Sequence, residues 1–103
     1  MTLHDDMTGF RLAAEDLARA ATIAEPTTRI RAIFEAVSAE TGIPVRILTG
    51  EVRRTNVVRA RHLVWFIARR EGFSLNEIAR VTGHDNATVR HGIRKEQEAR
   101  GEL

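Results

Sequence analysis

Residues 74–95, SLNEIARVTGHDNATVRHGIRK, carry a concentration of side chains that bind anions. At the spacing of an α-helix, Val89 and Ile93 fall on one side of the second half of this segment. The opposite side carries small, polar and basic residues: Ala87, Arg90, His91 and Arg94, with Lys95 beside them. Arginine has a planar fork that grips a phosphate or a guanine edge through two hydrogen bonds. This side of the helix therefore predicts a surface for a polyanion.

The acid–base groups of the same segment, His84, Asp85 and His91, do not predict an enzyme. No serine or cysteine nucleophile accompanies them, and two histidines seven residues apart make a poor zinc site. We therefore expect no catalytic residue, no metal and no cofactor.

The residues around this basic face predict how it is positioned. Ser74 and Glu77 form an S-x-x-E capping box, which marks the start of a short helix. Gly83 can adopt the positive φ of a tight turn, and Asp85 or Asn86 can cap a second helix. A short helix, a turn containing glycine and a second helix with a basic face form a helix-turn-helix, whose second helix fits the major groove of DNA.

Two alternatives stay open for this pattern. Any helical hairpin with a glycine turn resembles a helix-turn-helix, and a basic face can simply be solvated. The acidic Glu96 and Glu98 favour solvation, because acids near phosphate are repelled.

The distribution of charge favours the DNA-binding interpretation. The net charge is only +2, but residues 46–95 hold eleven basic and four acidic side chains, a local balance of +7 against −5 for the rest. Such asymmetry is expected of a surface that binds a polyanion. Fifteen of the sixteen basic residues are arginine, which a GC-rich genome would also produce. Codon usage does not explain the clustering.

The periodicity of the remaining chain predicts an all-α domain of about five to six helices, with no strand. Outside residues 74–95 the expected helices cover residues 8–24, closed by Pro26; residues 27 or 28 up to Gly42; a short helix from Pro44 to Thr49; and residues 56–71, the longest and most central. We expect residues 1–25 to form an extra N-terminal helix and residues 26–103 to form the DNA-binding domain. The extra helix would pack on the domain or seat a partner.

Composition limits the cellular setting. A chain of 103 residues makes one domain, and it contains no cysteine. The start of the chain lacks an export signal, and the longest apolar run, residues 63–68, is far below the roughly 20 residues that span a bilayer. We expect a soluble protein of the cytoplasm, associated with the nucleoid and not with a membrane.

Residues from about 30 to 97 resemble the C-terminal DNA-binding domain of the bacterial replication initiator DnaA family. The matching segments are VRRTNVVRARHL (52–63), SLNEIARVTG (74–83) and HDNATVRHGIRK (84–95). The family signature reads Gly-Arg-Asp-His-Thr-Thr-Val and, after one residue, His. Four residues match it: Asp85, Thr88, Val89 and His91. Three differ, with His84, Asn86 and Ala87 where Arg, His and Thr are expected. The resemblance implies a helix-turn-helix preceded by a long helix and a basic loop.

The resemblance also implies roles for single residues. Arg53 lies where the family sends an arginine of the basic loop into the minor groove, and Arg61 where an arginine grips the DNA backbone. Arg69 matches a further basic position, with a surface salt bridge as the alternative, and His91 matches a groove contact, with an ordinary surface histidine as the alternative. The residues expected to contact DNA are Arg53, Arg54, Arg59, Arg61, Arg69, Asp85, Asn86, Ala87, Thr88, Arg90, His91, Arg94 and Lys95.

The altered positions are those that read bases in the family, so general DNA binding is expected and recognition of the initiator's own site is not. The sequence has no G-x-x-x-x-G-K-[ST] nucleotide-binding motif. We therefore expect a regulator, and in particular an activator, of transcription. The alternatives are an accessory protein of replication initiation and a phage-type DNA-packaging protein. The expected partners are double-stranded DNA and either RNA polymerase, a DNA-bending protein or a second copy of the chain.

Overall fold

The structure is a computed structural model that describes residues 26–102 of the chain. These residues form five α-helices and no strand, which confirms the all-α prediction. The helices are α2 (Pro26–Thr41), α3 (Val45–Leu48), α4 (Thr55–Arg70), α5 (Leu75–Thr82) and α6 (Asn86–Ala99). The helix expected over residues 8–24 lies outside the described residues. Within residues 26–102, no helix has the length and apolarity to span a membrane.

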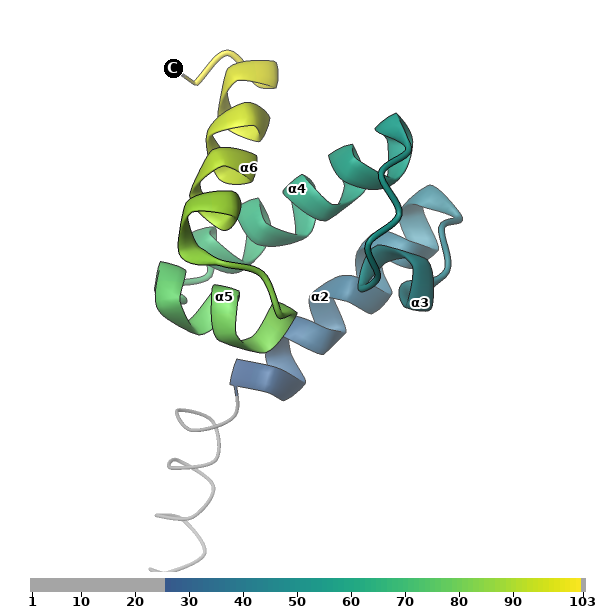
Figure 1. The fold of residues 1–103 in the computed structure, drawn as a ribbon, viewed down its shortest axis with the longest axis horizontal. Helices are drawn as coiled ribbons and strands as arrows, with labels where there is room; N and C mark the ends of the chain where they lie inside the picture. Colours follow the sequence, from purple (N-terminus) through teal and green to yellow (C-terminus); the bar gives the residue numbers. More distant parts are fainter. Residues whose placement is uncertain (1–25, 103) are drawn as a thin grey trace, which may run out of the picture.

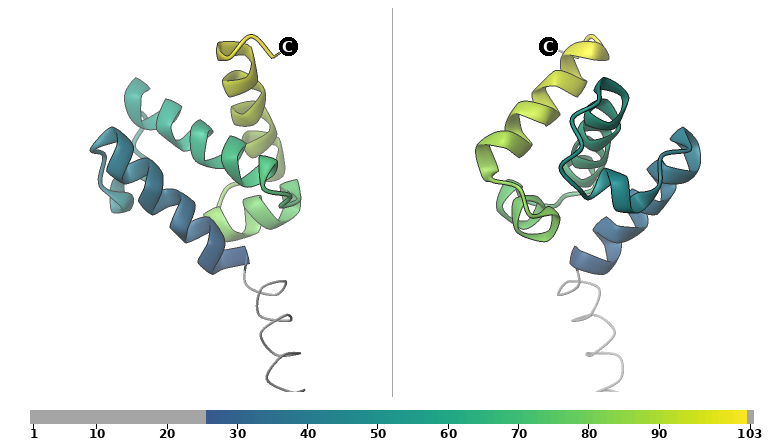
Figure 2. Two further views of the ribbon diagram at one scale, coloured as in Figure 1. Left: turned by 180° about the vertical axis from the view of Figure 1, so that it is seen from behind. Right: turned by 45° about the vertical axis from the view of Figure 1, so that its right-hand side comes forward.

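Helix α4 is the centre of the fold, as expected from the sequence for residues 56–71. It contacts each of the other four helices and lies between α2 and α6 (Figures 1 and 2). Its length of 16 residues is shared with α2, so it is not the single longest helix of the described part. The largest fully buried side chains come from all five helices: Trp65, Ile30, Leu48, Ile78, Val64 and Val89. Because α4 packs against every other described helix, it fixes the position of α6 relative to the rest of the core.

The start of α2 corrects one expectation. The helix was expected to begin at residue 27 or 28, but Pro26 is its first residue and is buried. A proline is well tolerated in the first turn of a helix, because its missing N–H would have no partner there and its φ is already helical. The proline is therefore part of the first turn of α2.

The turn between α5 and α6 is built by the expected residues. The Glu77 N–H donates to the Ser74 hydroxyl oxygen at 3.1 Å, and the Ser74 N–H donates to the Glu77 carboxylate at 3.0 Å, which completes the capping box. Gly83 has a φ of +73°, which glycine adopts at no steric cost. Asp85 rather than Asn86 is the N-cap of α6, and its carboxylate accepts from the Thr88 N–H at 2.7 Å. These local bonds set the direction in which α6 leaves the turn.

The far end of α6 is fastened to α4. The Arg70 and Arg100 guanidinium groups lie over the Phe66 ring, at 4.9 and 4.4 Å from its centroid. Arg70 also pairs with Glu102 at 3.2 Å. The contact of Arg100 with Phe66 and the Arg70–Glu102 ion pair each contribute modestly, but together they hold the end of α6 against α4.

Candidate nucleic-acid interface

The outward face of α6 presents the side chains that its spacing predicted. Val89, Gly92 and Ile93 are buried, Asn86 is half-buried, and the other predicted contacts on the helix are exposed: Ala87, Thr88, Arg90, His91, Arg94 and Lys95. Asp85, at the cap, is exposed as well. The surface is therefore accessible along the whole first half of the helix. Contact of each residue with DNA remains a prediction.

Three polar side chains at the start of this face form a hydrogen-bonded chain. The Asn86 amide donates to Asn76 Oδ1 of α5 at 2.7 Å, and Asn86 Oδ1 accepts from Arg90 Nη2 at 3.1 Å. The chain fixes which end of the Asn86 amide faces Arg90. Asn76 was not expected to contribute, because its partner is ten residues away and lies on another helix.

Each of the two acidic residues that argued for a merely solvated face has a basic partner. Glu98 lies 3.7 Å from both Arg94 Nε and Lys95 Nζ, and Glu96 pairs with Arg100 Nε at 3.2 Å. A phosphate would have to compete with Glu98 for Arg94 and Lys95. Arg90 forms no ion pair among the described residues, so it is the more available cation.

The basic loop, residues 51–54, runs between α3 and α4, and its Arg53 and Arg54 are exposed. Arg53 lines one side of a surface hollow of about 570 Å³, and Thr88 of α6 lines the same hollow. The loop and the start of α6 thus border one recess. A protein that contacts two adjacent grooves of one duplex needs two such elements side by side. Arg59 is exposed and lines a different hollow, which is also lined by Leu63 of α4 and Glu96 of α6.

Arg61 occupies a different position from the expected surface contact. It is 6% exposed. Its Nε donates to the Leu48 carbonyl at 2.9 Å, and its Nη2 donates to the carbonyls of Gly50 at 2.7 Å and Val52 at 3.2 Å. Burial lowers its pKa, and nearby Arg53 lowers it further. Arg61 therefore ties the end of α3 and the basic loop to α4, and a direct phosphate contact from it stays a prediction.

Of the two roles expected of Arg69, the surface salt bridge is not found within the described residues. Its Nη1 donates to the Phe73 carbonyl at 3.0 Å, which closes the turn after α4. It shares a shallow hollow of about 480 Å³ with Arg90 and Arg94. Its contact with DNA remains a prediction, since that hollow borders α6.

Gly92 sets how closely α6 approaches α4. A Cβ at this position would lie 2.4 Å from Trp65 Cε3 and 2.7 Å from His62 Cδ2. Trp65 is 2% exposed and cannot move aside freely. Sequence reasoning passed over Gly92, because a glycine on the buried side of a helix signals a close approach only when its neighbour is known.

Histidines surround Trp65 on the side of the hollow. The Trp65 ring lies 5.1 Å from the His84 ring and 5.7 Å from the His62 ring, and His62 lies 6.3 Å from His91, between ring centroids. Burial lowers the pKa of both His62 and His84. The pKa of His62 is lowered further by nearby His91, and that of His84 by nearby Arg61. These two histidines therefore favour the neutral form in the folded protein.

Asp85 is committed to the backbone of α6. The hydrogen bond from the Thr88 N–H to its carboxylate lowers its pKa, so the group stays ionised as a cap. A negative charge is favourable at a helix N-terminus. Contact of Asp85 with a base remains a prediction.

Comparison with known proteins agrees with this geometry. The family model of the bacterial dnaA protein helix-turn-helix matches residues 30–95. The chromosomal replication initiator protein DnaA of Kosmotoga olearia is 34% identical over 64 residues, which are 61% of this chain and 14% of that protein. The chain thus spans a small part of the length of this relative. No solved structure matches the chain.

The matched residues include α4, the turn and the face of α6 described above. A helix-turn-helix of this type is a DNA-binding unit and is not itself catalytic. Since the family model covers more than half of the sequence, the chain belongs to the bacterial DnaA helix-turn-helix family and carries its DNA-binding domain.

Proposed function

We propose that the protein recognises a specific double-stranded DNA site and regulates transcription by occupying it. One observation supports this proposal most directly: Arg53 of the basic loop and Thr88 of α6 line the same hollow. An arginine in the minor groove and a helix in the adjacent major groove would then hold one duplex from two sides. Occupancy of a site needs only these surfaces.

Recognition would depend on the first half of α6. Ala87, Arg90 and His91 are exposed there, and Arg90 is held by Asn86. Arginine pairs with two acceptors of guanine, while a small side chain such as alanine accommodates a thymine methyl group. A site that contains both bases at adjacent positions is the expected target.

Selection from a random duplex library, followed by transcription from a promoter that carries the selected site, tests the proposal. We expect one preferred sequence, and a change in transcript level when the protein binds it. Arg90→Ala should change the selected sequence. Arg31→Ala, which removes an exposed arginine of α2, is the matched control and should leave the sequence unchanged.

A second candidate is an accessory role in replication initiation. It is favoured by the relative from Kosmotoga olearia, which is named a chromosomal replication initiator. If the selected site lies in an origin, and the protein alters replication of an origin plasmid without altering transcription, this second role replaces the first. Binding without any sequence preference would contradict both.

A further inference from the structure

A further surface hollow lies on the opposite side of the basic loop from the hollow that Arg53 and Thr88 share. It has a volume of about 340 Å³ and is walled by α3, the loop and the first turn of α4. Its apolar lining includes Ile43, Ile47, Val52 and Val57. Val52, 36% exposed, is the one exposed large hydrophobic residue in the described part of the chain. We call this hollow the loop pocket.

The two sides of the loop carry alternate residues. Glu51 and Arg53 line the hollow beside α6, whereas Val52 and Arg54 line the loop pocket. Successive side chains of an extended segment point in opposite directions, and Arg54 has extended dihedral angles, φ −66° and ψ 144°. One short segment therefore presents Arg53 towards the DNA-binding side and Val52 with Arg54 towards the pocket.

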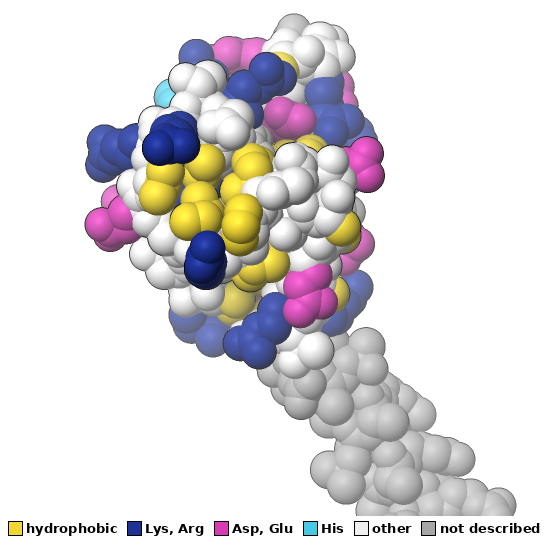
Figure 3. Space-filling view, turned by 90° about the vertical axis from the view of Figure 1, so that its right-hand side faces the viewer, with side chains coloured by type: hydrophobic (Ala, Val, Ile, Leu, Met, Phe, Trp, Pro, Cys, Tyr) yellow, Lys and Arg dark blue, Asp and Glu magenta, His cyan; other side chains and the backbone are white. Residues whose placement is uncertain are grey.

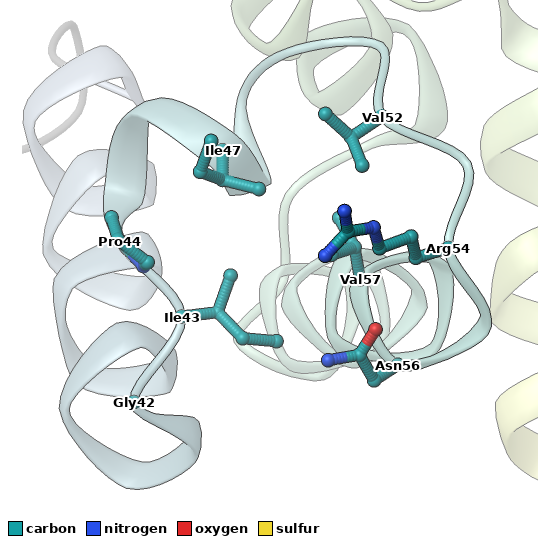
Figure 4. A pocket seen from close by; sticks show the side chains of 8 residues that line it. All are labelled: Gly42, Ile43, Pro44, Ile47, Val52, Arg54, Asn56 and Val57. Carbon is teal, nitrogen blue, oxygen red and sulfur yellow. The ribbon is translucent and has the colours of Figure 1, made fainter.

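The loop pocket is already formed in the folded chain. Arg61 holds the carbonyls of Leu48 and Val52, at the end of α3 and within the loop, so both walls are fixed to α4. Figure 4 shows Ile43, Ile47 and Val52 turned towards one another around the hollow. When a pocket needs no rearrangement, little binding free energy is spent on ordering the protein.

The charge beside the pocket indicates what it accepts. The Arg54 guanidinium reaches across the hollow, and no carboxylate of residues 26–102 forms an ion pair with it (Figure 4). On this face of the molecule, hydrophobic side chains gather together, with basic side chains directly beside them and both basic and acidic side chains farther out (Figure 3). A ligand that fills the pocket with an apolar group and places a carboxylate on Arg54 satisfies both features. A neighbouring hollow shares Ile43 with the pocket and adds Leu63 of α4, so the apolar lining continues beside it, which favours a segment of a protein over a small molecule.

We propose that the loop pocket binds a short segment of a partner protein that presents one bulky aliphatic or aromatic side chain beside an aspartate or glutamate. Since Arg53 faces the other way, this segment and duplex DNA bind at the same time. The basic loop is then the bridge between a DNA site and the protein that acts there. The proposal goes beyond DNA binding and does not depend on whether transcription or replication is regulated.

The test is a display selection with the full chain and a random decapeptide library. We expect the enriched peptides to share a bulky apolar residue next to an acidic one. In an anisotropy titration, Val52→Ser and Arg54→Gln should each weaken binding of the best peptide at least tenfold. Arg46→Gln, which removes an exposed arginine of α3 that does not line the pocket, is the matched control and should change binding less than twofold.

Methyl NMR locates the peptide without any variant. We expect shifts at Ile43, Ile47 and Val52, none at Val89 of the α6 core, and the same shifts when duplex DNA is present. A selection that enriches basic peptides or nothing, or affinity unchanged in Val52→Ser, overturns the proposal. If duplex DNA displaces the peptide, the pocket belongs to the DNA-binding side. If Val52→Ser abolishes a dimer, the pocket serves self-association. Either result also overturns the proposal.

Discussion

Replacing Gly92 by alanine tests the claim that close approach of α6 to Trp65 positions the DNA-binding face. The new methyl group would lie 2.4 Å from a Trp65 ring carbon, where carbon atoms normally sit about 3.5–4.0 Å apart. The two groups must therefore move apart by roughly 1 Å or more, which is the difference between these separations. Trp65 is enclosed by the core, so α6 has to move or the core has to strain.

Two opposing terms set the expected magnitude. Alanine in a helix is favoured over glycine by about 1 kcal/mol. Overpacking a well-packed interior costs about 1–3 kcal/mol. The clash should win, because Trp65 and His62 are both in the way, and we expect a net loss of up to about 2 kcal/mol. For a domain of this size, that lowers Tm by up to about 15 °C.

Thermal unfolding and a duplex titration measure the effect. DNA affinity should fall as well, because displaced α6 side chains no longer match the spacing set by the basic loop. Ala87→Gly changes helix propensity at an exposed position of α6 and serves as the control for the propensity term. Pairing Gly92→Ala with Trp65→Phe, which shortens the ring, should recover part of the loss. An unchanged or raised Tm in Gly92→Ala, with unchanged DNA affinity, would refute the reasoning.

Arg61→Lys keeps the charge but loses the planar guanidinium that donates to several carbonyls, so the free energy of unfolding should fall by about 2–4 kcal/mol. Hydrogen exchange at the backbone amides of residues 49–54 should become faster, and unchanged exchange would contradict the positioning role of Arg61. Since burial lowers the pKa of His62 and His84, the unfolded chain takes up protons first as pH falls below about 6.5, so stability is full above that pH and declines below it. Tm should drop between neutral pH and mild acid, and replacing both histidines by glutamine should flatten that drop. Asn76→Ala frees the Asn86 amide and should change the base preference in a duplex selection, while Asn76→Asp keeps the oxygen acceptor and should retain the preference with weaker affinity. With about five to eight phosphate contacts, log affinity should fall with log salt at a slope of about −4.5 to −7, and a slope near zero would remove the electrostatic argument.

The elements that sequence predicted well are those fixed by nearby residues. The capping box of Ser74 and Glu77 closes over three residues, and Gly83 and Asp85 act within the same turn. The burial of Val89 and Ile93 follows from their spacing. Local hydrogen bonds and helical periodicity are properties of a short window, so the helix-turn-helix could be predicted from the chain alone.

The structural roles that the sequence did not predict depend on distant partners. Arg61 belongs to a basic segment and was expected at the surface, but its hydrogen bonds go to carbonyls 9 to 14 residues earlier in the chain. Gly92 and Asn76 acquire their roles only from Trp65 and Asn86, on other helices. No short window contains both members of such a pair. The structure is needed to find that Arg61 holds the loop.

Trp65 has a practical consequence, because it is the only tryptophan of the sequence. Its ring lies against His84 and His62 and borders the hollow that Arg53 and Thr88 share. Indole emission depends on its immediate surroundings, and a protonated imidazole nearby quenches it. The unlabelled protein thus contains one optical reporter, located between the basic loop and α6. A change in its fluorescence during a duplex titration or an acid titration originates at that place and nowhere else in the chain.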